Sequence, residues 1–388
     1  MNIFVIGTID NRGGAAVVSW ELRKKLKSLG HTVNTFVRYK YSDEPDVFVI
    51  PRKRYQDWLV KIFANDLTFS FTKYLLETKE FKEADIVHCH NLQSNFFDLK
   101  LLEEMSKRKP VIWTLHGLWP ITGFASDTYT RKYHSKKRFL LFLWDNTPHL
   151  LKIKQKIYSK SKLIIVAVSE WIKREAERSI LGGQKIMRIY NCVDVDTYKP
   201  QDKTALRKEL GLPQDKKIVA CSIKGWPTSN RIIDNYADNN EVFFVAIGFT
   251  YIKTPNKNFI AVPYIKEKNI LSKYLAATDV FLHPTQGDSF GIIAGEALAC
   301  GIPVVTWNID AMPEVVPHKK AGYIAILDDE EDLRRGIEYI LSLPKEEYER
   351  MSIWSRKWVS DNFSLEKMCE EYMALYAQVL EEKNCSLS

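Results

Sequence analysis

Residues 281–306 read FLHPTQGDSFGIIAGEALACGIPVVT, and their order of apolar and polar residues indicates the class of fold. The apolar residues 280–282 predict a short strand, which ends at a proline and a polar loop. A helix is expected from about Ser289 to Cys300, where a glycine and a proline end it. The apolar residues 304–306 predict a second strand. A strand, helix, strand unit of this kind indicates a parallel sheet whose polar loop lies at the carboxyl ends of the strands, where open α/β sheets bind ligands.

Two carboxylates lie in this unit, Asp288 at the start of the expected helix and Glu296 about two turns later. Eight residues at helical rise separate them by about 12 Å. The backbone N–H groups of Phe290, Gly291 and Ile292 are expected to be unpaired, and with the helix dipole they favour a phosphate or a sugar hydroxyl. A structural alternative is that Asp288 only caps the helix and that Glu296 is a solvated carboxylate.

The spacing Asp288-x7-Glu296, followed by AlaLeuAlaCysGlyIleProValVal, resembles the acidic-x7-acidic signature of retaining GT-B glycosyltransferases of the family 4 type, glycosyl transferases group 1. The first acid of that signature is usually Glu, and Asp288 is one methylene shorter. The resemblance implies an α/β protein with two Rossmann-like domains facing across a cleft. It places an acceptor-side domain in residues 1–195 and a domain that binds the nucleotide sugar in residues 196–364. It also implies that a last helix, residues 365–388, crosses back onto the first domain.

The length of 388 residues also predicts two domains. The six cysteines are scattered without a CxxC pair, which favours a reducing cytoplasm and no structural zinc. The chain opens MNIFVIG, without a basic leader, and no stretch reaches the ~20 apolar residues of a membrane span. We therefore expect a cytoplasmic protein.

Positive charge is concentrated in the first half of the chain. Residues 1–195 hold 33 Lys and Arg against 20 Asp and Glu, a net charge of +13, within a whole-chain charge of +8. Two segments, residues 52–76 and 131–162, mix basic and aromatic side chains. They are suited to an anionic membrane surface or a lipid-linked acceptor, on the inner face of the cytoplasmic membrane. The alternatives are a solvated surface and amphipathic packing on the core. Nucleic acid is disfavoured because no nucleic-acid fold motif accompanies the charge.

The amino terminus reads as a Rossmann-like opening, with a strand at Asn2–Gly7 and a loop that leads into a helix. The loop carries Gly13-Gly14 and no GxGxxG, so a dinucleotide dehydrogenase is poorly supported. A glycine pair at a helix start admits a phosphate or sugar close to the backbone. The alternative is a tight turn that needs glycine for its shape. In the resembled family the matching loop faces the donor diphosphate and the acceptor.

Residues 84–91 and 111–117 predict two further strands that end in histidines. His90 and His116 are therefore expected at the same edge of the sheet as the glycine pair. The resemblance implies that His116 meets the donor sugar, orients a hydroxyl and stabilises developing charge. Alternatively, each is a hydrogen-bonded loop residue, while His88 is expected in the core.

Two cations are candidates for neutralising the donor diphosphate. The family's basic pair is expected near residues 218–231, where Lys224 and Arg231 are the candidates. The surrounding sequence matches the family pattern poorly, and either residue is alternatively a solvated loop cation.

The function implied by the resemblance is transfer of a sugar from a UDP- or GDP-linked donor to a hydroxyl acceptor, with retention at the anomeric carbon. His116 and Asp288 are the expected catalytic residues. No metal-ligand spacing and no further cofactor are expected. A lipid-linked glycan in bacterial surface polysaccharide synthesis is the expected acceptor. The alternatives are a non-catalytic subunit that binds a sugar nucleotide and a sugar-nucleotide epimerase of the same fold.

Overall fold

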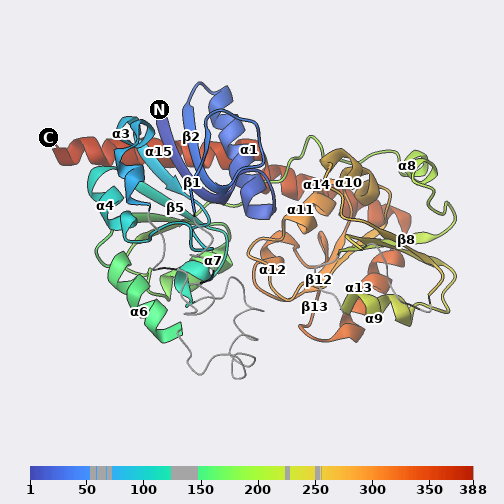
Figure 1. Ribbon diagram of the computed structural model, residues 1–388. Coiled ribbons are helices and arrows are strands. Elements are labelled where there is room, and N and C mark those ends of the chain that lie inside the picture. Colours follow the sequence, from blue (N-terminus) through green and yellow to red (C-terminus); the bar gives the residue numbers. More distant parts are fainter. Residues whose placement is uncertain are drawn as a thin grey trace. The chain divides into compact units, whose positions relative to one another are not determined.

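The computed structural model describes residues 1–52, 58, 67, 72–123, 147–222, 228–249, 254 and 256–387 (Figure 1). The chain divides into a first unit, Met1–Asn191 with Met368–Ser388, and a second unit, Cys192–Lys367. Much of the two basic and aromatic segments, and Lys224, lie outside the described residues.

The first unit is built on a seven-stranded sheet in the order β3-β2-β1-β4-β5-β6-β7, and every pair of neighbours is parallel. Its strands are β1 Asn2–Ile9, β2 Thr32–Tyr39, β3 Val47–Val49, β4 Ile86–Cys89, β5 Val111–Leu115, β6 Leu163–Ala167 and β7 Lys185–Arg188. Strands β4 and β5 are buried along their whole length, which explains why they read as almost continuous apolar runs.

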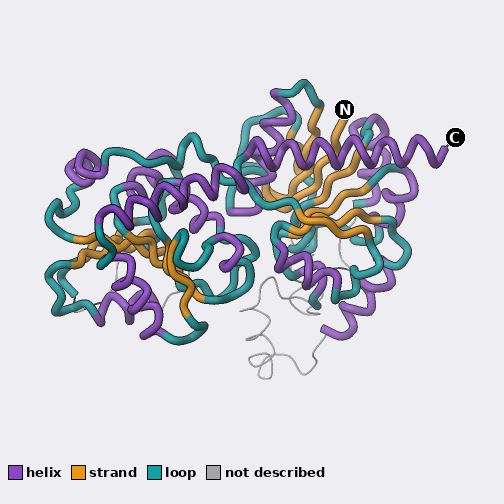
Figure 2. The backbone as a smooth tube through the Cα atoms, turned by 180° about the vertical axis from the view of Figure 1, so that it is seen from behind, coloured by secondary structure: helices purple, strands orange, loops and turns teal. Residues whose placement is uncertain are grey.

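Helices surround this sheet in the alternating pattern that parallel strands require. They are α1 Gly14–Ser28, α3 Lys79–Glu83, α4 Leu101–Arg108, α6 Thr147–Tyr158 and α7 Glu170–Glu177, with the 3-10 turns η1 Lys73–Glu77 and η2 Trp119–Ile121. The last helix, α15 Leu365–Leu387, runs across the strands of the first unit (Figure 2). The expected return of the C-terminal helix to the first domain is confirmed.

The second unit has a six-stranded parallel sheet in the order β10-β9-β8-β11-β12-β13. Its strands are β8 Lys217–Ser222, β9 Val242–Ile247, β10 Phe259–Val262, β11 Val280–His283, β12 Val304–Trp307 and β13 Gly322–Ala325. Its helices are α8 Lys203–Glu209, α9 Thr228–Asn235, α10 Lys268–Ala276, α11 Ile292–Ala299, α12 Met312–Val315, α13 Glu330–Leu341 and α14 Lys345–Phe363.

Each sheet has one point where the strand order reverses, between β1 and β4 in the first unit and between β8 and β11 in the second. Ligands of open α/β sheets bind outside the carboxyl ends of the strands at such points. The predicted fold of two Rossmann-like domains is confirmed. Of the helices in the described part of the chain, none combines the length and the apolar character needed to cross a membrane.

Candidate functional site

The glycine pair lies after β1, at the reversal point of the first sheet. Gly13 has a φ of +85°, and a Cβ added to it would contact nothing within 4 Å. Glycine is therefore needed here for its backbone conformation and not for space. Helix α1 begins at Gly14 with no side-chain cap and no acid in its first turn. Both glycines are exposed, so this helix start can receive a phosphate or a sugar hydroxyl.

Three histidines cluster at the carboxyl ends of β4 and β5. The rings of His88 and His90 have centroids 4.2 Å apart, and Nδ1 of His90 lies 3.0 Å from Nε2 of His116. Burial lowers the pKa of His88 to about 3, that of His116 to about 4 and that of His90 well below its usual value. All three rings are therefore neutral at pH 7.

His116 has one satisfied and one open ring nitrogen. Its Nδ1 is buried and has no hydrogen-bond partner among the described residues. A neutral imidazole nitrogen in this state can exchange a hydrogen bond with a substrate hydroxyl. Sequence reasoning placed His90 and His116 at one edge of the sheet, and the structure brings them into contact.

The third histidine, His88, is held by the C-terminal helix. It is 1% exposed, as expected for a core residue. Its Nδ1 lies 2.8 Å from the hydroxyl of Tyr376, and its Nε2 lies 2.8 Å from Oγ1 of Thr114. Thr114 in turn lies 2.8 Å from the hydroxyl of Tyr372. Both nitrogens of His88 are thus satisfied, which fixes the ring against which His90 packs.

In the second unit, α11 begins at Ile292, three residues later than expected. The reason is Gly291, whose φ of 83° is left-handed and cannot continue into a right-handed helix from Ser289. A Cβ on Gly291 would approach Cε of Met312 to 2.1 Å, so the end of the Met312 side chain would have to move to admit any other residue. The separation of about 12 Å predicted between the two acids assumed an unbroken helix. That assumption is wrong for the first residues of this stretch.

Asp288 forms the cap of this helix start. Its Oδ1 accepts hydrogen bonds from the N–H groups of Phe290 at 3.3 Å and Gly291 at 2.9 Å. The expectation that these two N–H groups are unpaired is wrong, because the loop brings the carboxylate onto them. Ile292, the first residue of α11, keeps an N–H without a partner inside the helix.

Two residues not anticipated from the sequence surround Asp288. Its Oδ2 lies 3.7 Å from Nε2 of His283, a fully buried residue whose Nδ1 lies 3.1 Å from Oγ of Ser222. Asp310 accepts the backbone N–H of Asp288 at 3.1 Å. Since His283 ends β11 and Ser222 ends β8, their contact spans the reversal point of the second sheet. The strand-end rule that selected His90 and His116 also applies to His283.

Glu296 is a half-buried carboxylate on α11 and not the solvated group of the structural alternative. Burial raises its pKa to about 7, although a hydrogen bond from the hydroxyl of Tyr198 and the charge of Lys268 favour ionisation. Tyr198 is 1% exposed. The sequence did not identify Tyr198, because it lies in the segment between the two sheets. Only the folded structure brings it next to Glu296.

The raised pKa predicts a stability change with pH. The unfolded chain releases the Glu296 proton near pH 4.5 and the folded chain near pH 7, so the free energy of unfolding falls as pH rises across this interval, by no more than about 3 kcal/mol. The buried neutral histidines have the opposite effect, because the free energy of unfolding falls as pH drops below 6.5, where the unfolded chain takes up protons on these side chains. Urea unfolding between pH 4.5 and 7.5 should show that the free energy of unfolding increases more with pH in Glu296→Gln than in the wild type, because the opposing contribution of Glu296 is absent. Equal pH profiles for the two proteins would contradict this assignment.

Of the two candidate cations for the diphosphate, the structure describes Arg231 but not Lys224. Arg231 lies on α9, and its Nε donates to Oε1 of Glu330 at 2.7 Å. That hydrogen bond raises the pKa of Arg231. Arg231 is therefore paired with Glu330 in this structure, and its role toward a diphosphate stays a prediction. Lys224 lies outside the described residues. In the ranges that the structure describes, no cluster of three or more His, Cys, Asp or Glu residues is arranged to hold a metal ion.

Two family models match this chain. Residues 12–197 match the model described as Glycosyltransferase Family 4, and residues 229–358 match the model described as Glycosyl transferases group 1. Together the matches include the glycine loop, His90, His116 and both acids of the second unit.

Individual relatives and solved structures agree with these matches. The chain is 25% identical to N-acetyl-alpha-D-glucosaminyl L-malate synthase of Bacillus anthracis, over 96% of each chain. It is 24% identical to an uncharacterized 41.2 kDa protein in the cps region of Klebsiella pneumoniae, over 78% of this chain and 81% of that one. Its fold resembles the crystal structure of HepE of Anabaena in complex with UDP, with a TM-score of 0.72, 16% identity, and coverage of 97% and 100%.

Proposed function

Because the chain belongs to the GT-B glycosyltransferases of the family 4, group 1 type, we propose that it transfers a sugar from a nucleotide-sugar donor to a hydroxyl acceptor with retention at the anomeric carbon. The observation that carries this proposal is the pair of acids at the reversal point of the second sheet, one capping the start of α11 and the other half-buried beside Tyr198. A UDP- or GDP-linked donor is proposed. The UDP held by the Anabaena structure of the same fold supports the uridine form.

The two units take different substrates in this proposal. The second unit binds the nucleotide sugar, with Asp288 toward the transferred sugar and Glu296 toward the ribose. The backbone N–H of Ile292 and the dipole of α11 favour the diphosphate. Phe290 and Gly291 contribute by shaping the loop, since Asp288 already holds their N–H groups. The first unit binds the acceptor, with Gly13 and Gly14 as bare backbone at its site.

His116 contributes as a neutral group. Its open Nδ1 orients a sugar hydroxyl by a hydrogen bond, and His90 holds the opposite nitrogen. The main work of the protein is then to position donor and acceptor and to stabilise the charge that develops on the departing diphosphate. A phosphate oxygen of the leaving group takes the acceptor proton on the same face, which gives retention without a covalent enzyme intermediate. No metal ion and no cofactor besides the donor take part in this proposal.

We propose a lipid-linked glycan as the acceptor, in the synthesis of bacterial surface polysaccharide at the inner face of the cytoplasmic membrane. The net charge of +13 in residues 1–195 supports contact with anionic lipid. The similarity to a protein encoded in a cps region is consistent with this role.

Nucleotide release from purified protein tests the proposal. The chain is incubated with UDP-glucose, UDP-N-acetylglucosamine or GDP-mannose, with EDTA or with Mg²⁺, and with or without bacterial glycolipid as acceptor. We expect acceptor-dependent release of UDP or GDP at equal rates in EDTA and Mg²⁺, and a product whose anomeric proton has the donor's configuration. Binding of a donor without release would favour the non-catalytic subunit, and interconversion of donor sugars without acceptor would favour the epimerase.

A further inference from the structure

The face of α15 that packs on the first sheet carries two tyrosine hydroxyls, those of Tyr372 and Tyr376. The buried residues of this face follow helical spacing and are Met368, Cys369, Tyr372, Leu375, Tyr376 and Val379. The two tyrosines are 3% and 0% exposed, so each hydroxyl depends on a partner inside the protein.

The partners of these hydroxyls are a threonine and a histidine of the first sheet. The hydroxyl of Tyr376 lies 2.8 Å from Nδ1 of His88, and that of Tyr372 lies 2.8 Å from Oγ1 of Thr114. Oγ1 of Thr114 also lies 2.8 Å from Nε2 of His88, which closes one continuous chain of hydrogen bonds. Apolar groups of the same shape would pack at such a place with little or no loss of stability. Core packing alone therefore does not account for this chain, whose effect is to fix the ring of His88 from both sides.

The ring of His88 limits the ring of His90. The two residues are two apart along β4 and its extension, so their side chains lie on one face, with ring centroids 4.2 Å apart. The main chain of His90 is held independently, because its N–H donates to the carbonyl of Ile6 at 2.9 Å and its carbonyl accepts the indole N–H of Trp113 at 2.8 Å. Only the side-chain torsions of His90 are left to vary, and His88 packs against that ring.

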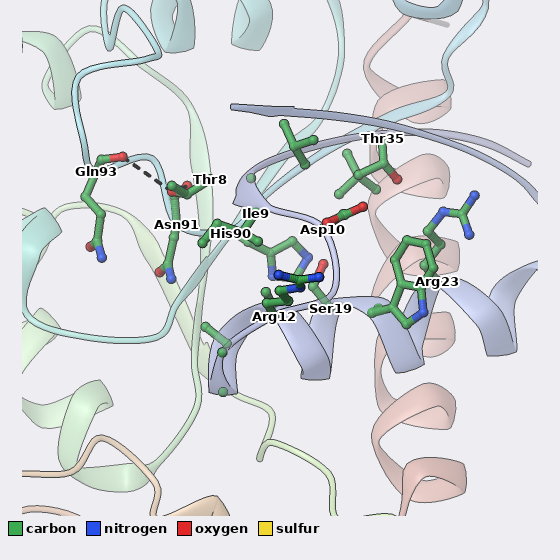
Figure 3. A pocket seen from close by; sticks show the side chains of 18 of the residues that line it. Thr8, Ile9, Asp10, Arg12, Ser19, Arg23, Thr35, His90, Asn91 and Gln93 are labelled. Atoms are coloured by element: carbon green, nitrogen blue, oxygen red, sulfur yellow. Dashed lines mark hydrogen bonds between the residues drawn. The ribbon is translucent and has the colours of Figure 1, made fainter. Parts of the chain in front are cut away.

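His90 connects this packing to the candidate site. It lines the cavity at the glycine loop (Figure 3), and its Nδ1 lies 3.0 Å from Nε2 of His116. Burial lowers the pKa of His88 to about 3, that of His116 to about 4 and that of His90 well below its usual value. At pH 7 each ring is thus neutral and has one N–H donor and one acceptor nitrogen. A continuous series of ring contacts leads from α15 to the open Nδ1 of His116.

We propose that Tyr376 is a positioning residue for sugar transfer, which fixes the orientation of the His116 ring. It acts through the two intervening rings, those of His88 and His90. The inference rests on the proposed function, because it concerns the histidine that orients a sugar hydroxyl there. Tyr376 itself is fully buried and contacts no substrate. Small displacements of a group that orients a substrate are costly in rate, so a change on α15 reaches the reaction.

Two nearly isosteric substitutions should force opposite tautomers of His88. Tyr376→Phe leaves Nδ1 of His88 without a partner, and Thr114→Val leaves Nε2 without one. A buried N–H group without an acceptor is the rarer and costlier defect, so the proton should lie on Nε2 in Tyr376→Phe and on Nδ1 in Thr114→Val. Neither substitution removes the hydrogen bond between His90 and His116.

NMR of protein labelled with ¹⁵N-histidine at pH 7.5 reports which nitrogen of each ring carries the proton. We expect opposite tautomers of His88 in the two variants, and ring signals of His90 and His116 that shift in both. In Tyr376→Phe, kcat for transfer should fall about 10-fold. The Kd of UDP and of GDP, measured by calorimetry, should stay at the wild-type value, because we place the nucleotide in the second unit.

Tyr236→Phe is the matched control. Tyr236 is a tyrosine of the second unit that is 5% exposed, and its hydroxyl has no hydrogen-bond partner among the residues that the structure describes. The same change there should leave the histidine signals and kcat unchanged.

The proposal is overturned if the signals of His90 and His116 keep their wild-type positions in Tyr376→Phe, if Tyr236→Phe shifts them equally, or if Tyr376→Phe weakens nucleotide binding and leaves kcat unchanged. If Tyr376→Phe does not fold, the signals of His116 in Thr114→Val decide by the same criterion. Shifted signals in a chain whose wild type transfers no sugar would reject the proposed function and leave the coupling of Tyr376 to His116 standing.

Discussion

Replacing Asp288 by asparagine is expected to lower kcat for sugar transfer about 100-fold while leaving the melting temperature unchanged. Asparagine keeps the side-chain oxygen that accepts the N–H groups of Phe290 and Gly291, so the start of α11 remains capped. It removes the negative charge that we place against the transferred sugar. Charged hydrogen-bond partners in a catalytic site are worth about 3–4 kcal/mol, which corresponds to 10²–10³ in rate.

Asp288→Ala should lose the cap as well as the charge, and should therefore unfold about 1 kcal/mol more easily. The matched control is Asp202, which caps α8 by accepting the N–H of Ala205 at 3.1 Å. Asp202→Asn should leave both activity and stability unchanged, and Asp202→Ala should reduce stability alone. Transfer at the wild-type rate by Asp288→Asn would show that Asp288 is only a cap.

His116→Ala is the second substitution with a large expected effect, a loss of about 100-fold in kcat. It removes the open Nδ1 and leaves Nδ1 of His90 without its partner at 3.0 Å. Because the pKa of His116 is held at about 4, the wild-type rate should show no inflection from this residue between pH 5 and 8. Kinetics of nucleotide release from pH 5 to 9 measure both effects.

His149→Ala, at an exposed position of α6 in the same unit, is the control for the histidine substitution. It should match the wild type in rate and melting temperature. A wild-type rate for His116→Ala would contradict the role of a neutral imidazole. So would a wild-type rate that drops with an apparent pKa near 6.5, if His116→Ala no longer shows this pH dependence.

The fold was accessible from the sequence because its determinants are local. Parallel strands that are buried on both faces appear in the sequence as apolar runs, as at Val111–Leu115. The end of α11 was predicted from Gly301, which has a positive φ in the structure. Strand ends also predicted that His90 and His116 share an edge of the first sheet. These inferences need only periodicity and the position of residues along an element.

The details of the site depend on contacts that periodicity does not encode. The left-handed Gly291 displaced the helix start, since a glycine in sequence does not reveal whether its φ is positive. The burial of Glu296 beside Tyr198 joins residues from distant segments. Arg231 was predicted to meet the diphosphate from its charge and from the expected place of the family's basic pair, while its partner Glu330 lies 99 residues away in the chain. Pairings between distant residues of this kind are invisible without an alignment or a structure.

The contact of α15 with the first sheet has a consequence for biosynthesis. Thr114 and its partner Tyr372 are 258 residues apart, and His88 and Tyr376 are separated by 288. A ribosome therefore completes both sheets before it releases the tyrosines that satisfy His88. Until then, His88 and Thr114 of the nascent amino-terminal unit lack the hydrogen bonds that Tyr376 and Tyr372 supply, while the second unit is translated and folds. Pulse proteolysis of stalled nascent chains should find the amino-terminal unit protected only after residue 376 has left the exit tunnel.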